Sequence, residues 1–110
     1  MRNDCFEFDE VTTAAANRLG FDPSDAKLLD GEAQIPIILT DTVSLRDLNS
    51  VMSILRQQGA KSVKLDTGPI INPSITNRLN NAVAENRKFI GFNVIKTNDP
   101  NNMFILKREL

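Results

Sequence analysis

The chain has 110 residues, of which 41% are hydrophobic, and this is enough for a single domain over residues 1–110 but too little for two. Its 13 lysine and arginine residues are balanced by 14 aspartate and glutamate residues, so no overall field draws it toward nucleic acid or an anionic membrane. Histidine is absent, which removes the usual general base at neutral pH and the commonest metal ligand. We therefore expect no enzyme, no metal and no cofactor, and neither nucleic acid nor membrane as a partner.

Cys5 is the single cysteine, so no intrachain disulfide can form and nothing requires an oxidising compartment. The first residues include an acid, Asp4, where a secretory signal would carry basic residues followed by an apolar run. No apolar stretch approaches the roughly 20 residues that are needed to span a bilayer. We expect a cytoplasmic protein in which Cys5 has no functional role.

The first predicted element is a helix over residues 10–19. Asp9 precedes it, and Gly20 follows it where a left-handed cap is wanted. The apolar stripe between these two caps consists of Val11, Ala14, Ala15 and Leu19. A turn at 21–25 and a short helical piece around 25–29 are expected to follow.

Residues 35–40 form a continuous apolar run, which is typical of a strand buried on both faces. Because Pro36 cannot donate to a ladder, the strand either begins at Ile37 or lies at a sheet edge. A helix is predicted after it, in which Ser44 is the cap and Asp47 completes a capping-box-like pair. The apolar stripe of that helix is Leu45, Leu48, Met52 and Leu55.

The remaining segments alternate between strand and helix. Residues 62–66 show the alternation of a strand, and Asn72-Pro73 is a good helix start because proline suits the first helical position. The buried stripe of this last helix is Ile75, Leu79, Ala82 and Val83. Two strands at 89–96 and 103–107 are separated by a polar turn, so they should pair as a hairpin.

This order of elements predicts an α/β fold, since strands that alternate with helices pair in parallel through right-handed crossovers. We expect a small three-layer or two-layer sandwich with a βαβαβ core, a C-terminal β-hairpin and an N-terminal helix. The residues expected in its core share single faces of these elements. They are Leu48, Met52, Leu55, Leu65, Leu79, Val83, Phe92 and Val94.

The loop at 66–72 is a candidate binding site, because it follows a parallel strand and precedes a helix whose N-terminal amides point outward. It has no Gly-Lys-Ser/Thr ending, so it is not a phosphate loop, and a simple turn is the alternative. The candidate binding residues are Asp66, Thr67, Gly68, Asn72 and Ser74. Asp41, Asp47 and Asp66 could assemble a carboxylate metal site at one end of the sheet, but capping and solvation account for the first two without a metal.

Two short patches resemble the motifs of retroviral-type aspartic proteases. Residues 63–68 read Val-Lys-Leu-Asp-Thr-Gly, and residues 89–93 read Phe-Ile-Gly-Phe-Asn. Such enzymes need two carboxylates that share a proton, which a small chain supplies by dimerising. A predicted helix lies between the patches where that family has a flap hairpin, and Pro69 stands where it has a small residue. A carboxylate-dependent hydrolase is therefore one alternative function, beside an ordinary strand end.

A wider pattern resembles the STAS family of anti-sigma-factor antagonists and related regulators. It runs through Leu28-Leu29-Asp30-Gly31, the strand at 35–40, the helix at 44–58, the stretch at 59–66, and Asn72-Pro73-Ser74-Ile75. The resemblance implies that Ser74, at the start of the next helix, is phosphorylated or faces a partner. This chain departs from the family where Pro73 replaces an aspartate and where strand 103–107 replaces the C-terminal helix.

These observations favour a non-enzymatic regulatory protein that binds a protein partner through residues 67–74 and the adjoining helix face. A small-molecule sensor that uses the strand ends is a second class of function, and the hydrolase is a third. The sequence does not identify the partner, and it leaves open whether the chain forms a homodimer.

Overall fold

The computed structural model describes residues 6–101 and 103–110, so Cys5 lies outside the described residues. The elements in chain order are α1 (Glu10–Leu19), the 3-10 helix η1 (Pro23–Asp25), β1 (Lys27–Leu29), β2 (Glu32–Pro36), α2 (Leu45–Gln57), β3 (Ser62–Asp66), α3 (Pro73–Ala84), β4 (Asn93–Lys96) and β5 (Phe104–Glu109). The predicted α/β class is confirmed, as are the N-terminal helix and the antiparallel C-terminal hairpin of β4 and β5.

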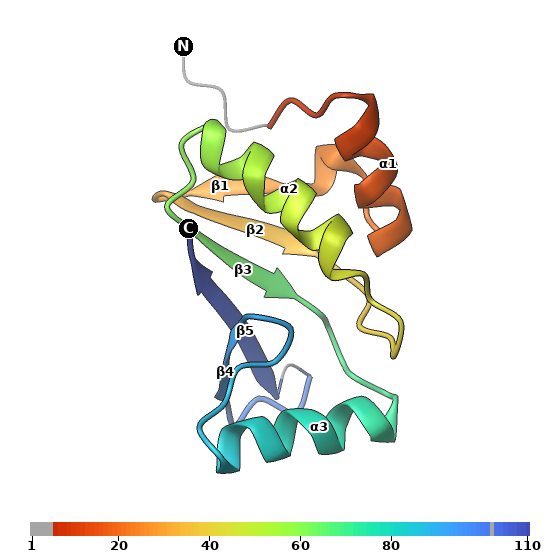
Figure 1. Ribbon diagram of the computed structural model, residues 1–110. Helices are drawn as coiled ribbons and strands as arrows, with labels where there is room; N and C mark the ends of the chain where they lie inside the picture. Colours follow the sequence, from red (N-terminus) through yellow and green to blue (C-terminus); the bar gives the residue numbers. More distant parts are fainter. Residues whose placement is uncertain (1–5, 102) are drawn as a thin grey trace.

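The described strands form one mixed sheet in the order β1-β2-β3-β5-β4 (Figure 1). β2 and β3 are parallel, and α2 connects them, whereas the other three pairings are antiparallel. Because β2 and β3 point the same way, the connections that follow them leave the same edge of the sheet. This edge carries the candidate site.

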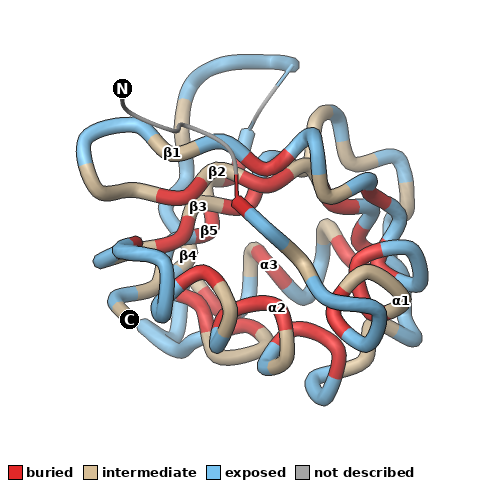
Figure 2. The backbone as a smooth tube through the Cα atoms, turned by 90° about the horizontal axis from the view of Figure 1, so that it is seen from above, coloured by how far each residue is buried: buried red, intermediate tan, exposed pale blue. Residues whose placement is uncertain are grey.

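One face of the sheet is buried and the other is open. The strand registers align the fully buried residues of one face with each other; they are Ala33, Ile35, Val63, Leu65 and Leu106. On the opposite face, the registers place Lys27, Gln34, Lys64 and Lys107 in one row, and each of them reaches solvent. Figure 2 shows α1 and α2 on the same side of the sheet. The buried residues of α3 belong to the same core cluster, so the arrangement has two layers, one of the two that the sequence predicts.

The strand predicted at 35–40 is wrong in its position and in its burial. β2 ends at Pro36 instead of beginning there, and only its alternate residues Ala33 and Ile35 are buried. The N–H of Ile37 donates to the carbonyl of Asp66 of β3 at 3.0 Å. The nitrogen of Pro36 therefore points to the other side of β2, where β1 lies. β1 has already ended on that side, since its pairing stops at Gln34. Pro36 thus sits in an inner strand without breaking its ladder.

The helical piece predicted around 25–29 is also wrong. η1 ends at Asp25, and residues 27–29 form β1, which pairs with β2 as a hairpin. The turn between them is Asp30-Gly31, in which both residues have positive φ, 52° and 80°. Such a turn matches the twist of a two-residue hairpin, and Asp-Gly is one of its preferred sequences.

α1 begins and ends as predicted, and Ala15 and Leu19 of its predicted stripe are buried, whereas Ala14 is half-buried and Val11 is exposed. Asp9 accepts a hydrogen bond from the N–H of Thr12 at 2.8 Å, and Gly20 closes the helix with a φ of 94°. The buried residues are Thr12, Ala15, Ala16 and Leu19, whereas Val11 is 71% exposed. The small alanine side chains allow α1 to pack closely against α2.

The strand predicted at 89–96 is interrupted near its start. Phe89 and Phe92 exchange two backbone hydrogen bonds of 2.9 Å around a turn at Ile90-Gly91, and β4 begins at Asn93. The rest of the core prediction agrees with the structure: Leu48, Met52, Leu55, Leu65, Leu79 and Phe92 are buried. Val83 and Val94 are partly buried and pack against this cluster. No helix in the described part of the chain has the length and apolar character to cross a membrane.

Candidate functional site

The end of β3 and the segment that follows it contain all five predicted binding residues. Asp66 ends the strand and is exposed. Its Oδ1 accepts a hydrogen bond from the N–H of Gly68 at 3.3 Å, and the hydroxyl of Thr67 donates to the carbonyl of Gly68 at 3.2 Å. Gly68 has a φ of 60°, which a glycine adopts at no steric cost. The first three predicted residues therefore form a tight polar turn.

The last two predicted residues begin α3. The N–H of Ser74 donates to Oδ1 of Asn72 at 2.9 Å, and the N–H of Thr76 donates to the carbonyl of Asn72 at 3.0 Å. Asn72 is therefore the N-cap, with Pro73 in the first turn as predicted. Ser74 is exposed in the first turn, and its hydroxyl makes no hydrogen bond to another described residue.

An exposed apolar side chain that was not among the predicted binding residues lies beside this turn. Ile71, between the polar turn and the cap, is 92% exposed, the largest fraction among the large hydrophobic side chains that the structure describes. Ile38 and Leu45, on the connection that follows β2 and at the start of α2, are 64% and 54% exposed. The Ile70-Ile71 pair within a turn was the available signal. Isolated exposed hydrophobics are common, but an isoleucine that is almost fully exposed in a turn at the end of a parallel strand suggests a contact surface.

The space beneath this segment is small. A hollow of about 100 Å³ is lined by Pro69, Ile70, Thr76, Pro100, Met103 and Phe104. Pockets that hold small ligands have volumes of roughly 300–1,000 Å³. The segment 66–74 therefore presents a surface for contact and not a cavity for a metabolite.

The equivalent connection after β2 is arranged differently. The hydroxyl of Ser44 accepts from the N–H of Asp47 at 3.2 Å, which confirms Ser44 as the cap of α2. The other half of the predicted capping box is wrong, because the carboxylate of Asp47 accepts from Nη2 and Nε of Arg18 at 2.9 and 3.1 Å. These hydrogen bonds lower the pKa of Asp47 and raise that of Arg18. A pair between α1 and α2 thus occupies this end of α2.

A cleft of about 390 Å³ lies next to this pair. Its lining includes the hydroxyl-bearing residues Thr40, Thr42 and Ser44, together with Ile38 and Gly20. The cleft has the volume of a small-ligand pocket and lies at the end of β2. It is the place where the small-molecule alternative would apply.

The three acids weighed for a metal site have separate surroundings. Asp47 is bound to Arg18, Asp41 lies 4.0 Å from Arg78, and Asp66 accepts from its own turn. The described residues contain no group of three potential metal ligands. The predicted helix between the two protease-like patches is present as α3. Asp66 itself lies exposed at the strand end.

Three comparisons with known proteins give no further guidance. No protein-family model, no curated protein and no solved structure matches this chain. The interpretation of the site therefore depends on its own geometry.

Proposed function

We propose that this protein is a non-enzymatic, cytoplasmic regulator that resembles STAS proteins and binds a protein partner through residues 66–74. The observation that carries this proposal is the 92% exposure of Ile71 at the centre of that segment. Burying a large apolar side chain contributes about 1.5–3 kcal/mol, so a partner that covers Ile71 gains directly from the contact. Such residues act as anchors in protein interfaces.

The surroundings of Ile71 fit the composition of an interface. Asp66 and Asn72 provide polar groups on either side of it along the chain. Protein interfaces combine an apolar centre with a polar rim in this way. Ser74 lies in the exposed first turn of α3, where the positive end of the helix dipole favours a phosphate or a partner carboxylate.

A small-molecule sensor is the second candidate function, and the cleft beside Thr40 and Thr42 is the observation in its favour. The two proposals differ in their ligands. A metabolite that binds only the folded state raises the midpoint of thermal unfolding. A screen that finds such a metabolite, with protection that is lost in Thr42→Val and retained in Ile71→Asp, would favour the sensor.

The test of the partner proposal is site-specific crosslinking in cells that express the chain. A photoreactive residue replaces Ile71 in one variant and Val11 in a control, since Val11 is also apolar and 71% exposed but lies on α1. We expect one discrete protein adduct from position 71 and none from position 11. The purified partner should then bind the wild-type chain directly. Equal crosslinking at both positions would refute the assignment of this surface.

A further inference from the structure

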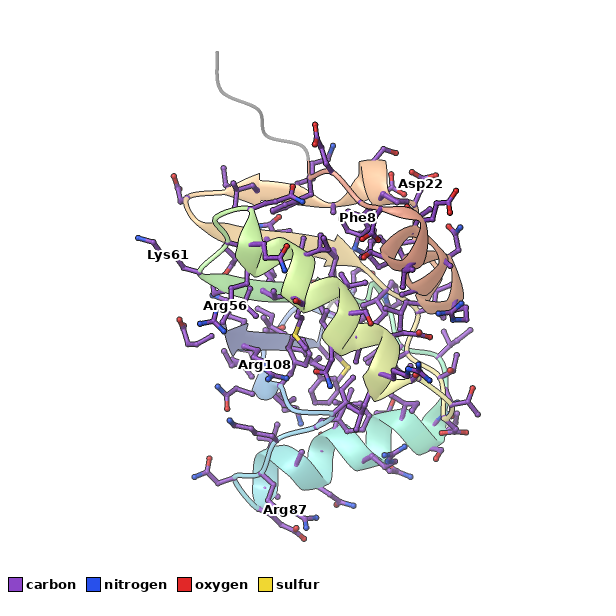
Figure 3. All side chains as sticks on the ribbon, turned by 45° about the horizontal axis from the view of Figure 1, so that its top comes forward. Phe8, Asp22, Arg56, Lys61, Arg87 and Arg108 are labelled. Atoms are coloured by element: carbon purple, nitrogen blue, oxygen red, sulfur yellow. The ribbon has the colours of Figure 1, made fainter. Side chains whose placement is uncertain are left out.

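A basic pocket lies at the C-terminal end of α3. Its volume is about 300 Å³, and its lining includes Arg78, Asn81, Arg87, Lys88, Phe89 and Ile90. Its lining begins at Arg78 in the middle of α3, one turn after Ser74, and continues past the end of the helix to Ile90. Figure 3 shows Arg87 at this end of α3, well away from Arg56 and Arg108.

The cationic groups of this pocket are only weakly neutralised. No acidic side chain lines it. The guanidinium of Arg78 lies 4.0 Å from Asp41, and the guanidinium of Arg87 pairs with Glu85 at 2.6 Å where both side chains are more than half exposed. Lys88 forms no ion pair with any residue that the structure describes. Exposed pairs of this kind contribute little, so an incoming anion can compete with them.

Two contacts give the pocket a defined shape. The guanidinium carbon of Arg78 lies 4.9 Å from the centre of the Phe89 ring, and Phe89 is buried. This cation–π contact holds the arginine in position. Ile90 forms part of the wall from the tight turn between Phe89 and Phe92, where its φ is 47°. A β-branched residue in this region of φ is unusual, and it is held there by the two hydrogen bonds of the turn.

The end of α3 does not oppose an anion as strongly as a free helix C-terminus would. The carbonyl of Asn81 accepts from the N–H of Glu85 at 2.9 Å, and the carbonyl of Ala82 accepts from the N–H of Arg87 at 2.8 Å. These bonds occupy carbonyl groups that otherwise repel negative charge. The side-chain amide of Asn81 adds a neutral donor to the lining.

We propose that this pocket binds a phosphate group, either free phosphate or the phosphoryl end of a small metabolite. Two guanidinium groups and one ammonium group together present many N–H donors, which suits the several oxygens of a phosphate dianion better than a single carboxylate. The proposal is independent of the partner surface, because it uses none of the residues 66–74.

The test is a titration with inorganic phosphate, and separately with glycerol phosphate, followed by amide chemical shifts in NMR at constant ionic strength. We expect saturable shifts at residues 78–90. Lys88→Gln and Arg87→Gln should each weaken binding by about tenfold or more, the usual effect of losing a charge-assisted hydrogen bond. Arg46→Gln is the matched control, because it removes one exposed cation on α2.

Each result has a defined meaning. Binding of both probes identifies the phosphoryl group as the ligand, and stronger binding of glycerol phosphate points to a metabolite as its source. Binding of inorganic phosphate alone points to free phosphate. Non-saturable shifts spread over all the cationic side chains, or an equal loss in Arg46→Gln, would overturn the proposal. Thermal unfolding of the exposed Lys88 variant confirms that it is folded.

Discussion

The connections that follow β2 and β3 occupy equivalent places in the fold but are used differently. Each follows a parallel strand, leaves the same edge of the sheet and leads to a helix with a side-chain cap, Ser44 for α2 and Asn72 for α3. At α2, Asp47 of the first turn is buried and bound to Arg18 of α1, although Leu45 and Arg46 beside it are exposed. At α3, Pro73 and Ser74 remain exposed.

This difference shows how one topology provides both a structural junction and an open surface. The ends of parallel strands are where α/β proteins bind ligands, because the helix N-termini gather there. In this chain, the guanidinium of Arg18 on α1 binds at one of the two helix starts, that of α2. The other has no such cover among the described elements, and Ile71 extends from it into solvent.

The largest expected effect is on the stability that the pair of Arg18 and Asp47 provides at the start of α2. Asp47→Ala should lower the unfolding midpoint in urea by a clear margin, because Asp47 is buried and joins α1 to α2 through two hydrogen bonds with Arg18. Asp41→Ala is the control, since its 4.0 Å pair with Arg78 is exposed. Equal losses in the two variants would show that the pair of Arg18 and Asp47 does not distinguish the junctions.

The same pair predicts a dependence on acid. The hydrogen bond from Arg18 lowers the pKa of Asp47 below its ordinary value of 3.8. The unfolded chain therefore binds the proton more tightly, so the stabilisation is complete above that ordinary value and is lost as the pH falls through the lowered one. Thermal midpoints measured from neutral pH down to this range should fall less steeply in Asp47→Asn than in the wild type. Parallel curves would contradict this.

The caps of α2 and α3 should contribute equally to the free energy of unfolding, although the surroundings of the two helix starts differ. Ser44→Ala and Asn72→Ala each remove an acceptor for a first-turn N–H, and each should cost about 1 kcal/mol of the free energy of unfolding. Chemical denaturation measures both. A cost at Asn72 near zero would mean that water replaces the cap at the open junction.

The smallest effect on stability is expected at Ser74. Ser74→Ala and Ser74→Asp should change the free energy of unfolding by less than about 0.5 kcal/mol, since the residue is exposed and Asn72 makes the cap. Partner affinity should nevertheless differ between the two variants if this position is the switch that the STAS resemblance implies. Identical affinity in both variants and the wild type would eliminate the switch.

Local sequence signals predicted much of this fold. The caps at Ser44 and Asn72, the left-handed Gly20 and the buried positions Leu48 of α2 and Leu79 of α3 depend on neighbouring residues, and the structure contains all of them. The segment around 27–29 was mispredicted because only its pairing with β2 makes it a strand, although the following Asp-Gly was a usable signal.

The parts that could not be predicted depend on residues far apart in the chain. The partner of Asp47 is Arg18, 29 residues away, and the burial of only one face of β2 depends on where the helices pack. The exposure of Ile71 has the same origin, because an apolar residue in a turn is buried or exposed according to what lies over it. The five predicted site residues do share one segment, but its apolar centre emerged only from the structure.

The most direct measurement of the central claim compares the affinity of the crosslinked partner for Ile71→Asp and for Val11→Asp. Both substitutions place a charge at an exposed apolar position, so both variants should keep the wild-type unfolding midpoint. We expect Ile71→Asp to weaken partner binding by about tenfold or more, as the loss of an interface anchor does, and Val11→Asp to bind like the wild type. Wild-type affinity in Ile71→Asp would contradict the assignment of residues 66–74 as the partner surface.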